Sequence, residues 1–219
     1  MERIPEPELM TEEDQARAYA QADFEEPHAR CLALLEESFP DLPAAGAAID
    51  LGCGPGDIAL RFARAHPRWE VDGVDGSRAM LRFGQEILMR TDLGGRVRLV
   101  HAYLPRDPLP RERYAFIFSN SLLHHLADPR VLWSTVRSAG PPGTPVFIMD
   151  LMRPASREEA RRLVDENSKG EPEVLRKDFF HSLLAAYRPA EVEEQLAAAS
   201  LRLEVLPVSD RHWIARGRL

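Results

Sequence analysis

Three glycines at alternate positions, Gly52, Gly54 and Gly56, stand in the segment Ile49–Gly56. Glycine adopts positive φ at no steric cost and lets a ligand lie against bare backbone. A helix predicted over Asp57–His66 would begin directly after this loop. Its first turn offers unpaired N–H groups to an anionic group such as a carboxylate. The segment therefore predicts a ligand site built from a strand, a tight loop and a helix.

Two acidic residues restrict the class of ligand that this loop can bind. The dinucleotide-binding pattern places a third glycine at the position that Asp57 occupies, and a carboxylate there would repel a pyrophosphate. Asp75 lies 19 positions after Gly56, at the end of the next predicted strand. An acidic residue at that place accepts hydrogen bonds from the two ribose hydroxyls of an adenosine. We therefore expect an adenosine-containing ligand without a pyrophosphate.

Four segments carry a resemblance to a known family. "IDLGCGPGD" and "VDGVDGS" resemble motifs I and II of the class I S-adenosylmethionine-dependent methyltransferases. The turn "HAYLP" is similar to the segment that flanks adenine in that family, with His101 where an acidic residue is usual. The segment from Tyr114 to Leu126 resembles the family's "FDxVxxxxxLHHL" pattern, with Ala115 replacing an aspartate. The resemblance spans Ala47–Leu151 by motif and nearly the whole chain by order of elements.

The resemblance implies a Rossmann-like methyltransferase fold, S-adenosyl-L-methionine as cofactor and S-adenosyl-L-homocysteine as product. It also implies that the N-terminal segment folds over the cofactor as a lid. With no acid at His101, main chain or another side chain would meet the adenine amino group. The implied cofactor-binding residues are Asp50, Leu51, Gly52, Cys53, Gly54, Gly56, Asp75, Gly76, Met80, Ala102, Tyr103, Leu104, Asn120, Ser121 and, from the lid, Tyr19.

Methyl transfer from a sulfonium needs no nucleophilic residue, because holding acceptor and methyl in line and excluding water supply most of the catalysis. An acceptor that is protonated at neutral pH also needs a base, for which histidine is suited. His124 and His125 follow the fourth predicted strand and are the candidate catalytic residues. The alternative is that either ring packs against neighbouring loops and satisfies backbone groups.

Candidate acceptor-binding residues come from two places. Phe24 and His28 lie in the N-terminal lid, although an aromatic residue near a helix end also suits the core. Asp150 and Arg153 follow the fifth strand, where an ion pair within the segment and the following insertion is the alternative. A helical insertion over 152–199 is the candidate for acceptor selection, because additions at the strand ends carry specificity in this fold. Within it, the residues of first interest are Lys177, Phe179 and Phe180.

Short apolar stretches alternate with stretches of helical periodicity, which predicts a doubly wound, mostly parallel seven-stranded α/β sheet. The predicted strands are 47–51, 70–74, 97–100, 115–119, 146–149, 201–206 and 211–216. The last two are joined by Pro207–Asp210, which suits an antiparallel pair. We expect one domain of N-terminal helices (1–45), cofactor-binding core (46–151), helical insertion (152–199) and C-terminal strand pair (200–219).

Composition restricts the partners. A net charge of −7 disfavours a nucleic-acid surface, because phosphate binding relies on lysine and arginine. The sequence shows neither a membrane-spanning stretch nor a basic-then-apolar leader, so we expect a cytoplasmic protein without a membrane partner. The two cysteines, Cys31 and Cys53, form no four-ligand zinc set, so we expect reduced thiols and no metal.

The leading hypothesis is methyl transfer to a small-molecule acceptor by in-line displacement. A macromolecular methyltransferase is an alternative. Enzymes that methylate amino groups of nucleobases or glutamine carry an "NPPY"-type motif, and this chain has Asn120-Ser121-Leu122-Leu123 at that place. A non-catalytic S-adenosylmethionine-binding protein and an NAD(P)-dependent oxidoreductase are further alternatives. The acceptor and the oligomeric state stay open.

Overall fold

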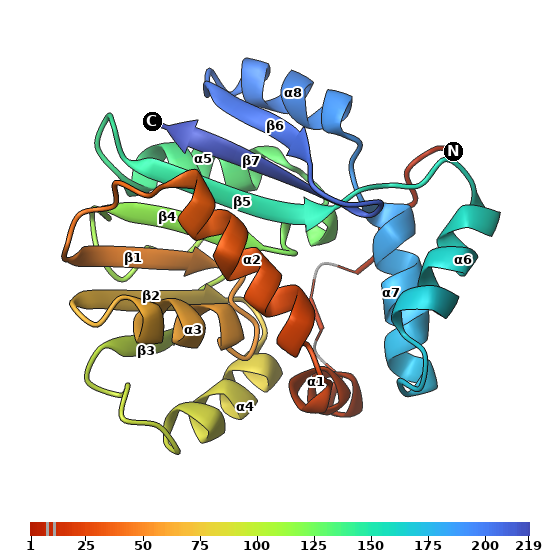
Figure 1. Cartoon of the computed structure of the whole chain (residues 1–219), viewed down its shortest axis with the longest axis horizontal. Coiled ribbons are helices and arrows are strands. Elements are labelled where there is room, and N and C mark those ends of the chain that lie inside the picture. Colours follow the sequence, from red (N-terminus) through yellow and green to blue (C-terminus); the bar gives the residue numbers. More distant parts are fainter. Residues whose placement is uncertain (8, 11) are drawn as a thin grey trace.

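The computed structural model describes residues 1–7, 9, 10 and 12–219 of the chain (Figure 1). The helices are α1 (Glu13–Gln21), α2 (Glu25–Ser38), α3 (Asp57–Ala65), α4 (Arg78–Leu88), the short 3-10 helix η1 (Leu123–His125), α5 (Arg130–Ala139), α6 (Arg157–Asn167), α7 (Glu173–Ala185) and α8 (Pro189–Ala198). The strands are β1 (Gly46–Leu51), β2 (Trp69–Asp75), β3 (Val97–His101), β4 (Phe116–Asn120), β5 (Pro145–Leu151), β6 (Leu203–Pro207) and β7 (His212–Arg218).

The strands form one seven-stranded sheet in the order β3-β2-β1-β4-β5-β7-β6. The first five run parallel, and β7 is antiparallel to both β5 and β6. The predicted doubly wound, mostly parallel sheet with a closing antiparallel pair is therefore confirmed. The order reverses between β1 and β4, which is where ligands bind in such sheets.

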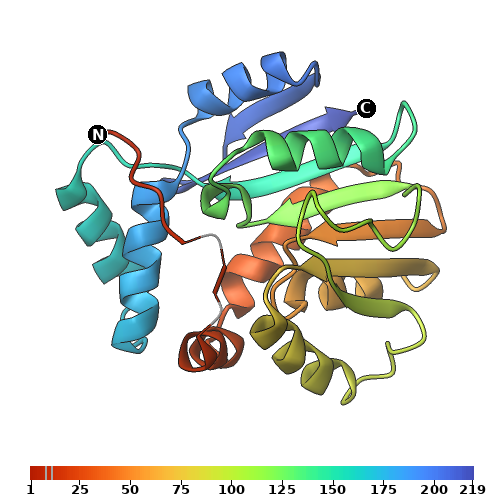
Figure 2. The same ribbon diagram turned by 180° about the vertical axis from the view of Figure 1, so that it is seen from behind.

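Helices cover both faces of the sheet (Figures 1 and 2). Apolar side chains of α2, α3 and α4 form one core cluster with the first face. Rings of Phe62, Trp69, Phe116 and Phe118 pack at its centre, with the Phe62 and Phe116 centroids 5.5 Å apart. Helices α5 and α8 form the second cluster, which contains Trp133 and Trp213. The strands are buried on both faces because helices lie over each of them, which explains their continuous apolar composition.

Helices α6 and α7 lie apart from these two layers. In Figure 1 the arrowheads of the parallel strands point toward them, and they share a separate apolar cluster that includes Leu163 and Leu183. The predicted insertion over 152–199 thus contains two different parts, because α8 packs on the sheet beside α5. Serine side chains cap the N-termini of two helices. The Ser77 hydroxyl accepts from Met80 N–H in α4, and the Ser156 hydroxyl accepts from Glu159 N–H in α6.

The chain before α1 forms a strap across the carboxyl edge of the sheet, and we use this name for described residues 1–10. Ile4 donates its N–H to the Leu184 carbonyl of α7 at 3.0 Å. Farther along, the Met10 carbonyl accepts from the Ser77 hydroxyl at 2.6 Å. The strap therefore joins the α6–α7 unit to the loop after β2. None of the helices formed by the described residues combines the length and apolarity that a membrane crossing requires.

Candidate active site

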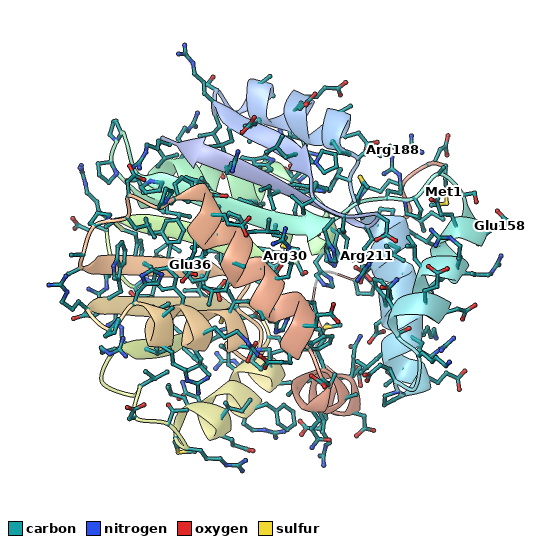
Figure 3. All side chains as sticks on the ribbon, viewed as in Figure 1. Met1, Arg30, Glu36, Glu158, Arg188 and Arg211 are labelled. Atoms are coloured by element: carbon teal, nitrogen blue, oxygen red, sulfur yellow. The ribbon has the colours of Figure 1, made fainter. Side chains whose placement is uncertain are left out.

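A cavity of about 1160 Å³ opens at the carboxyl edge of the parallel strands. Its wall is formed by the glycine loop, the ends of β2 and β4, helices α1, α2 and α7, and the β6–β7 connection. Figure 3 labels Arg30 on α2 and Arg211 beyond the β6–β7 turn, both of which line it. Pockets for drug-sized ligands have roughly 300–1,000 Å³. This cavity therefore accommodates two ligands side by side.

The glycine loop is shaped for close approach. Gly52, Gly54 and Gly56 have φ of 71°, 54° and 86°, which only glycine adopts readily. Most of the loop's donors are used within the protein: Gly52 and Cys53 both donate to the Val74 carbonyl. The sequence placed free N–H groups in the first turn of the following helix; the loop itself offers mainly bare backbone that a ligand can touch.

Asp75 is held at the end of β2 by two backbone donors. Its Oδ2 accepts from Gly54 N–H at 2.8 Å and its Oδ1 from Ser77 N–H at 2.7 Å. Burial raises the pKa of Asp75, and these two hydrogen bonds oppose the rise. Each carboxylate oxygen retains a second lone pair. This arrangement suits a bidentate acceptor for the paired hydroxyls of a ribose.

Asp50, the last polar residue before the loop, is 1% exposed and lines the cavity. Its Oδ2 has no hydrogen-bond partner among the described residues. Burial and the nearby Asp75 carboxylate raise the pKa of Asp50 to about 8. A buried carboxylate oxygen without a partner is costly unless a ligand supplies a donor or a positive charge.

The charges around the loop fit S-adenosylmethionine better than a dinucleotide. The cofactor carries a positive sulfonium and a positive ammonium, and the carboxyl groups of Asp50 and Asp75 make this part of the cavity favourable for positive charge. Asp57, whose position argued against a pyrophosphate, is held by His28 Nδ1 at 2.7 Å and by Arg61 Nε at 2.5 Å. Burial opposes ionisation, but these two partners lower the pKa of Asp57. The acidic lining is therefore chemically suited to a cationic cofactor.

Residues after β3 form the wall expected to flank adenine. Ala102, Tyr103 and Leu104 line the cavity, as does Met80 from α4. His101 turns away from this role, because its Nε2 lies 3.1 Å from the Gly76 carbonyl. His101 therefore does not take the place of the acidic residue that contacts adenine in the family. A purine would meet apolar side chains and main chain on this wall.

The roof over the loop comes from α1 and α2. Tyr19 and Phe24 pack with ring centroids 4.7 Å apart, and Phe24 in turn packs on His28 at 5.1 Å. All three line the cavity. Because His28 also holds Asp57, it joins the roof to the first turn of α3. Its ring nitrogen Nδ1 is therefore occupied within the protein.

The end of β4 forms the floor between the two halves of the cavity. Asn120 and Ser121 both line it. Ser121 has φ of 59°, in the left-handed region that non-glycine residues seldom adopt. Its N–H donates to the Met149 carbonyl at 2.9 Å, so the main chain is fixed in this conformation. Strained backbone of this kind concentrates at active sites.

His124 is oriented by Asp150. The ring Nδ1 contacts Asp150 Oδ1, and Asp150 Oδ2 accepts from Leu123 N–H at 2.6 Å. Burial alone would lower the pKa of His124, but Asp150 outweighs burial and raises it. Burial would raise the pKa of Asp150, but His124 outweighs burial and lowers it. The pair leaves Nε2 of His124, which lines the cavity, on the side of Glu6.

His125 differs from its neighbour in its surroundings. Burial and the adjacent His124 lower the pKa of His125 to about 3, so its ring is neutral. Its Nδ1 lies 3.3 Å from Glu6 Oε1 without forming a hydrogen bond. Burial raises the pKa of Glu6, and His124 opposes that rise. Glu6 comes from the strap, where nothing in the sequence singled it out.

Most of the predicted site residues meet in this cavity, but several do not. Leu51 is fully buried in the core, and Gly56 begins α3 behind the loop. Asp150 acts through His124 rather than lining the cavity. Arg153 is 5% exposed and is held by Glu191 and the Ala186 carbonyl, which matches the ion-pair alternative.

The α7 residues also divide. Phe179 lines the cavity, whereas Lys177 is exposed and Phe180 packs in the α6–α7 cluster. Asp178 and Ser182 line it as well, and neither stood out from the sequence. The signal for them was the helical spacing of Leu175, Phe179 and Ser182 on one face of α7, which becomes readable only once the cavity is known.

Comparison with known proteins agrees with the geometry. A family model described as a methyltransferase domain matches residues 48–143. An uncharacterized methyltransferase of Mycobacterium tuberculosis is 26% identical over 148 residues, which cover 68% of this chain and 72% of that protein. A trans-aconitate 2-methyltransferase of Variovorax paradoxus is 32% identical over 120 residues, which cover 54% of this chain and 42% of that protein.

Solved structures share the fold. A S-adenosylmethionine-dependent methyltransferase from Aquifex aeolicus superposes with a TM-score of 0.69 at 19% identity, covering 94% of this chain and 98% of that one. At this identity the likeness speaks for the fold. The matched domain, the curated relatives and the shared fold all indicate a class I S-adenosylmethionine-dependent methyltransferase, and the acidic, glycine-lined cavity agrees with them.

Proposed function

We propose that the chain transfers the cofactor's methyl group to a polar small-molecule acceptor by direct in-line displacement. The observation that carries this proposal is that one cavity contains both the loop with Asp50 and Asp75 and the pair His124 and His125. The cofactor lies in the first half. The acceptor lies in the second half, against His124, His125 and α7.

The lining of the second half favours a polar acceptor of limited size. His124, His125, Asp178 and Ser182 contribute polar groups, and Phe179 contributes an apolar surface. The strap crosses η1 beside this half and contacts α7, which favours a small molecule over a protein or a nucleic acid. Two relatives whose names state small-molecule substrates support the same choice: the trans-aconitate 2-methyltransferase and a 27-O-demethylrifamycin SV methyltransferase of Amycolatopsis mediterranei.

The chemistry proposed for the histidines is local. Asp150 fixes the ring of His124 so that Nε2 contacts the acceptor's nucleophilic atom, while His125 bounds the same space. The acceptor attacks the methyl carbon, the carbon–sulfur bond breaks, and S-adenosylhomocysteine leaves as a neutral thioether; a proton on the attacking atom passes to His124 Nε2. The protein's contribution is to align the two ligands and to exclude water.

Calorimetric titration with S-adenosylmethionine, followed by transfer of labelled methyl to phenols, thiols, amines and carboxylates, tests the proposal. Asp75→Asn should bind the cofactor about 10-fold to 100-fold more weakly, because hydrogen bonds to a charged acceptor contribute about 1.5–3 kcal/mol. The control is Asp41→Asn. Asp41 is exposed, precedes β1 and pairs with Arg218, so this variant should bind the cofactor normally. Cofactor binding without label in any acceptor class would contradict transfer and leave a cofactor-binding protein.

A further inference from the structure

Three ligand-type side chains meet at the edge of the acceptor half of the cavity: His124 and His125 from η1, which line it, and Glu6 from the strap. Their ligand atoms all lie within 4.8 Å of one another. Glu6 Oε1 is 3.6 Å from His124 Nε2 and 3.3 Å from His125 Nδ1. The two histidines are adjacent in the sequence, but Glu6 reaches them only because the strap crosses η1.

Two of these three atoms accept or donate no hydrogen bond within the described part of the chain. Glu6 Oε1 and His125 Nδ1 are buried and form no hydrogen bond with any described residue. A carboxylate oxygen and an unprotonated ring nitrogen that face each other at 3.3 Å repel unless a proton or a metal ion lies between them. Buried polar atoms without a partner are rare, and an unseen ion is one accepted explanation.

The spacing agrees with a tetrahedral ion. Ligand atoms about 2.0–2.1 Å from a zinc ion in that geometry stand about 3.3–3.4 Å apart. Of the two separations from Glu6 Oε1, the 3.3 Å distance to His125 Nδ1 matches that value and the 3.6 Å distance to His124 Nε2 is slightly longer. A site with three protein ligands and an open fourth position is the arrangement of catalytic rather than structural zinc.

The surrounding groups already orient two of the ligands. Asp150 contacts Nδ1 of His124, which directs Nε2 toward Glu6. Metal-binding histidines commonly hold a carboxylate on the second ring nitrogen in this way. The other oxygen of Glu6, Oε2, accepts from the Ser182 hydroxyl at 3.3 Å. That contact leaves Oε1 for the shared centre.

We propose that Glu6, His124 and His125 bind a divalent first-row transition-metal ion whose open position faces the cavity. On the proposed function, that position takes an oxygen or sulfur atom of the acceptor, and the ion then replaces the direct contact of that atom with His124 Nε2. A hydroxyl or thiol would bind as its anion and release its proton to solvent, and the bound atom would then receive the methyl group. Metal binding itself does not depend on that step.

The test uses the full chain, freed of metal by dialysis against a chelator and titrated with Zn²⁺ by calorimetry. We expect one equivalent of zinc per chain, and Co²⁺ should give the visible absorption of a tetrahedral site. Glu6→Gln and His125→Gln should each weaken zinc binding by more than roughly 10-fold, because loss of a ligand exceeds the effect of losing a supporting residue. His181→Gln removes an exposed histidine of α7 outside the cavity and is the control.

Glu6→Gln is the decisive variant, because Glu6 lies on the strap and its loss leaves the sheet intact. Circular dichroism and cooperative thermal unfolding check the fold of each variant. Zinc binding that is absent, or unchanged in both Glu6→Gln and His125→Gln, overturns the site. The same metal-free protein is titrated with S-adenosylmethionine, so a failed metal site and a failed cofactor site give separate results.

Discussion

Asp50 combines burial with a strongly shifted pKa. One of its carboxylate oxygens accepts no hydrogen bond from any described residue, and its pKa is raised to about 8. In the protein without cofactor the side chain is therefore largely protonated at neutral pH. A cationic ligand favours the ionised form, so ligand binding below about pH 8 releases a proton from this residue.

This coupling predicts the behaviour of Asp50→Asn. Between the unfolded pKa of 3.8 and the folded value of about 8, the folded protein holds a proton that the unfolded chain releases, so stability falls as pH rises. We expect the melting temperature of the cofactor-free wild type to decline more steeply from pH 5 to pH 8 than that of the variant. Scanning calorimetry across this range measures the difference.

The same variant should bind S-adenosylmethionine more weakly, because an amide does not neutralise the cofactor's charge. Loss of affinity together with a flatter pH dependence of stability is the expected signature. Equal pH slopes for the two proteins would contradict the protonation argument, whatever the effect on binding.

At single residues, the sequence predicted those whose type is dictated by the ligand. Gly52, Gly54, Asp50 and Asp75 stood out because bare backbone and carboxylates have few other uses after a buried strand. Glu6 did not, because its position depends on a strap without periodicity that crosses the molecule. The residues around Glu6 show no pattern that predicts its position beside His124 and His125.

Helix α4 supports the glycine loop through a single close contact. A Cβ added at Gly84 would lie 2.6 Å from the Pro55 carbonyl oxygen and 2.7 Å from Leu99 Cδ1. Backbone atoms cannot yield as a flexible side chain can. The absence of a side chain at Gly84 therefore lets α4 approach the loop and set its position.

Gly84→Ala is consequently predicted to act against the usual trend. In an exposed helix this change stabilises by about 1 kcal/mol. Here we expect a lower melting temperature and weaker cofactor binding, because α4 and the loop must separate. Gly94→Ala is the matched control, since a Cβ there meets nothing within 4 Å. Thermal unfolding and calorimetric titration of both variants decide it; a stabilised Gly84→Ala protein would contradict the packing argument.

Regular elements were predicted better than the connections between them. All seven strands were found, with bounds within a few residues, because buried parallel strands alternate with amphipathic helices. The prediction grouped α8 with α6 and α7, since three successive helices look alike in sequence. Only packing separates α8, which covers the sheet, from the pair that covers the cavity.

Across the whole molecule, Arg3 makes more side-chain hydrogen bonds to other elements than any other described residue of the strap. Its guanidinium donates to the Ala185 carbonyl at 2.6 Å and to the carbonyls of His124 and Leu126 at 2.9 and 3.2 Å. It also lies 4.2 Å above the ring of Tyr187. One side chain thus fastens the strap to α7, to η1 and to the segment before α8.

We expect Arg3→Ala to destabilise the protein by about 1.5–3 kcal/mol, the usual contribution of hydrogen bonds from a charged group. Arg3→Lys should recover little of this loss, because a single ammonium cannot reproduce the planar fork. Arg17→Ala removes an exposed arginine whose contact with Glu13 is 3.6 Å, and it should change stability by less than about 0.5 kcal/mol. Denaturant unfolding measures all three; equal losses for Arg3 and Arg17 would contradict the fastening role.

The strap has a consequence for how the chain reaches its final form. The partners of Arg3 lie 121, 123 and 182 positions away, so the strap docks only after almost every other element has been synthesised and packed. Closing such long loops is entropically unfavourable and is repaid by few contacts. Strap docking is therefore expected as a late folding event and as the first part to be lost on local unfolding. Transient undocking would open the covered half of the cavity without disturbing the sheet, so late assembly and access to the site would share one equilibrium.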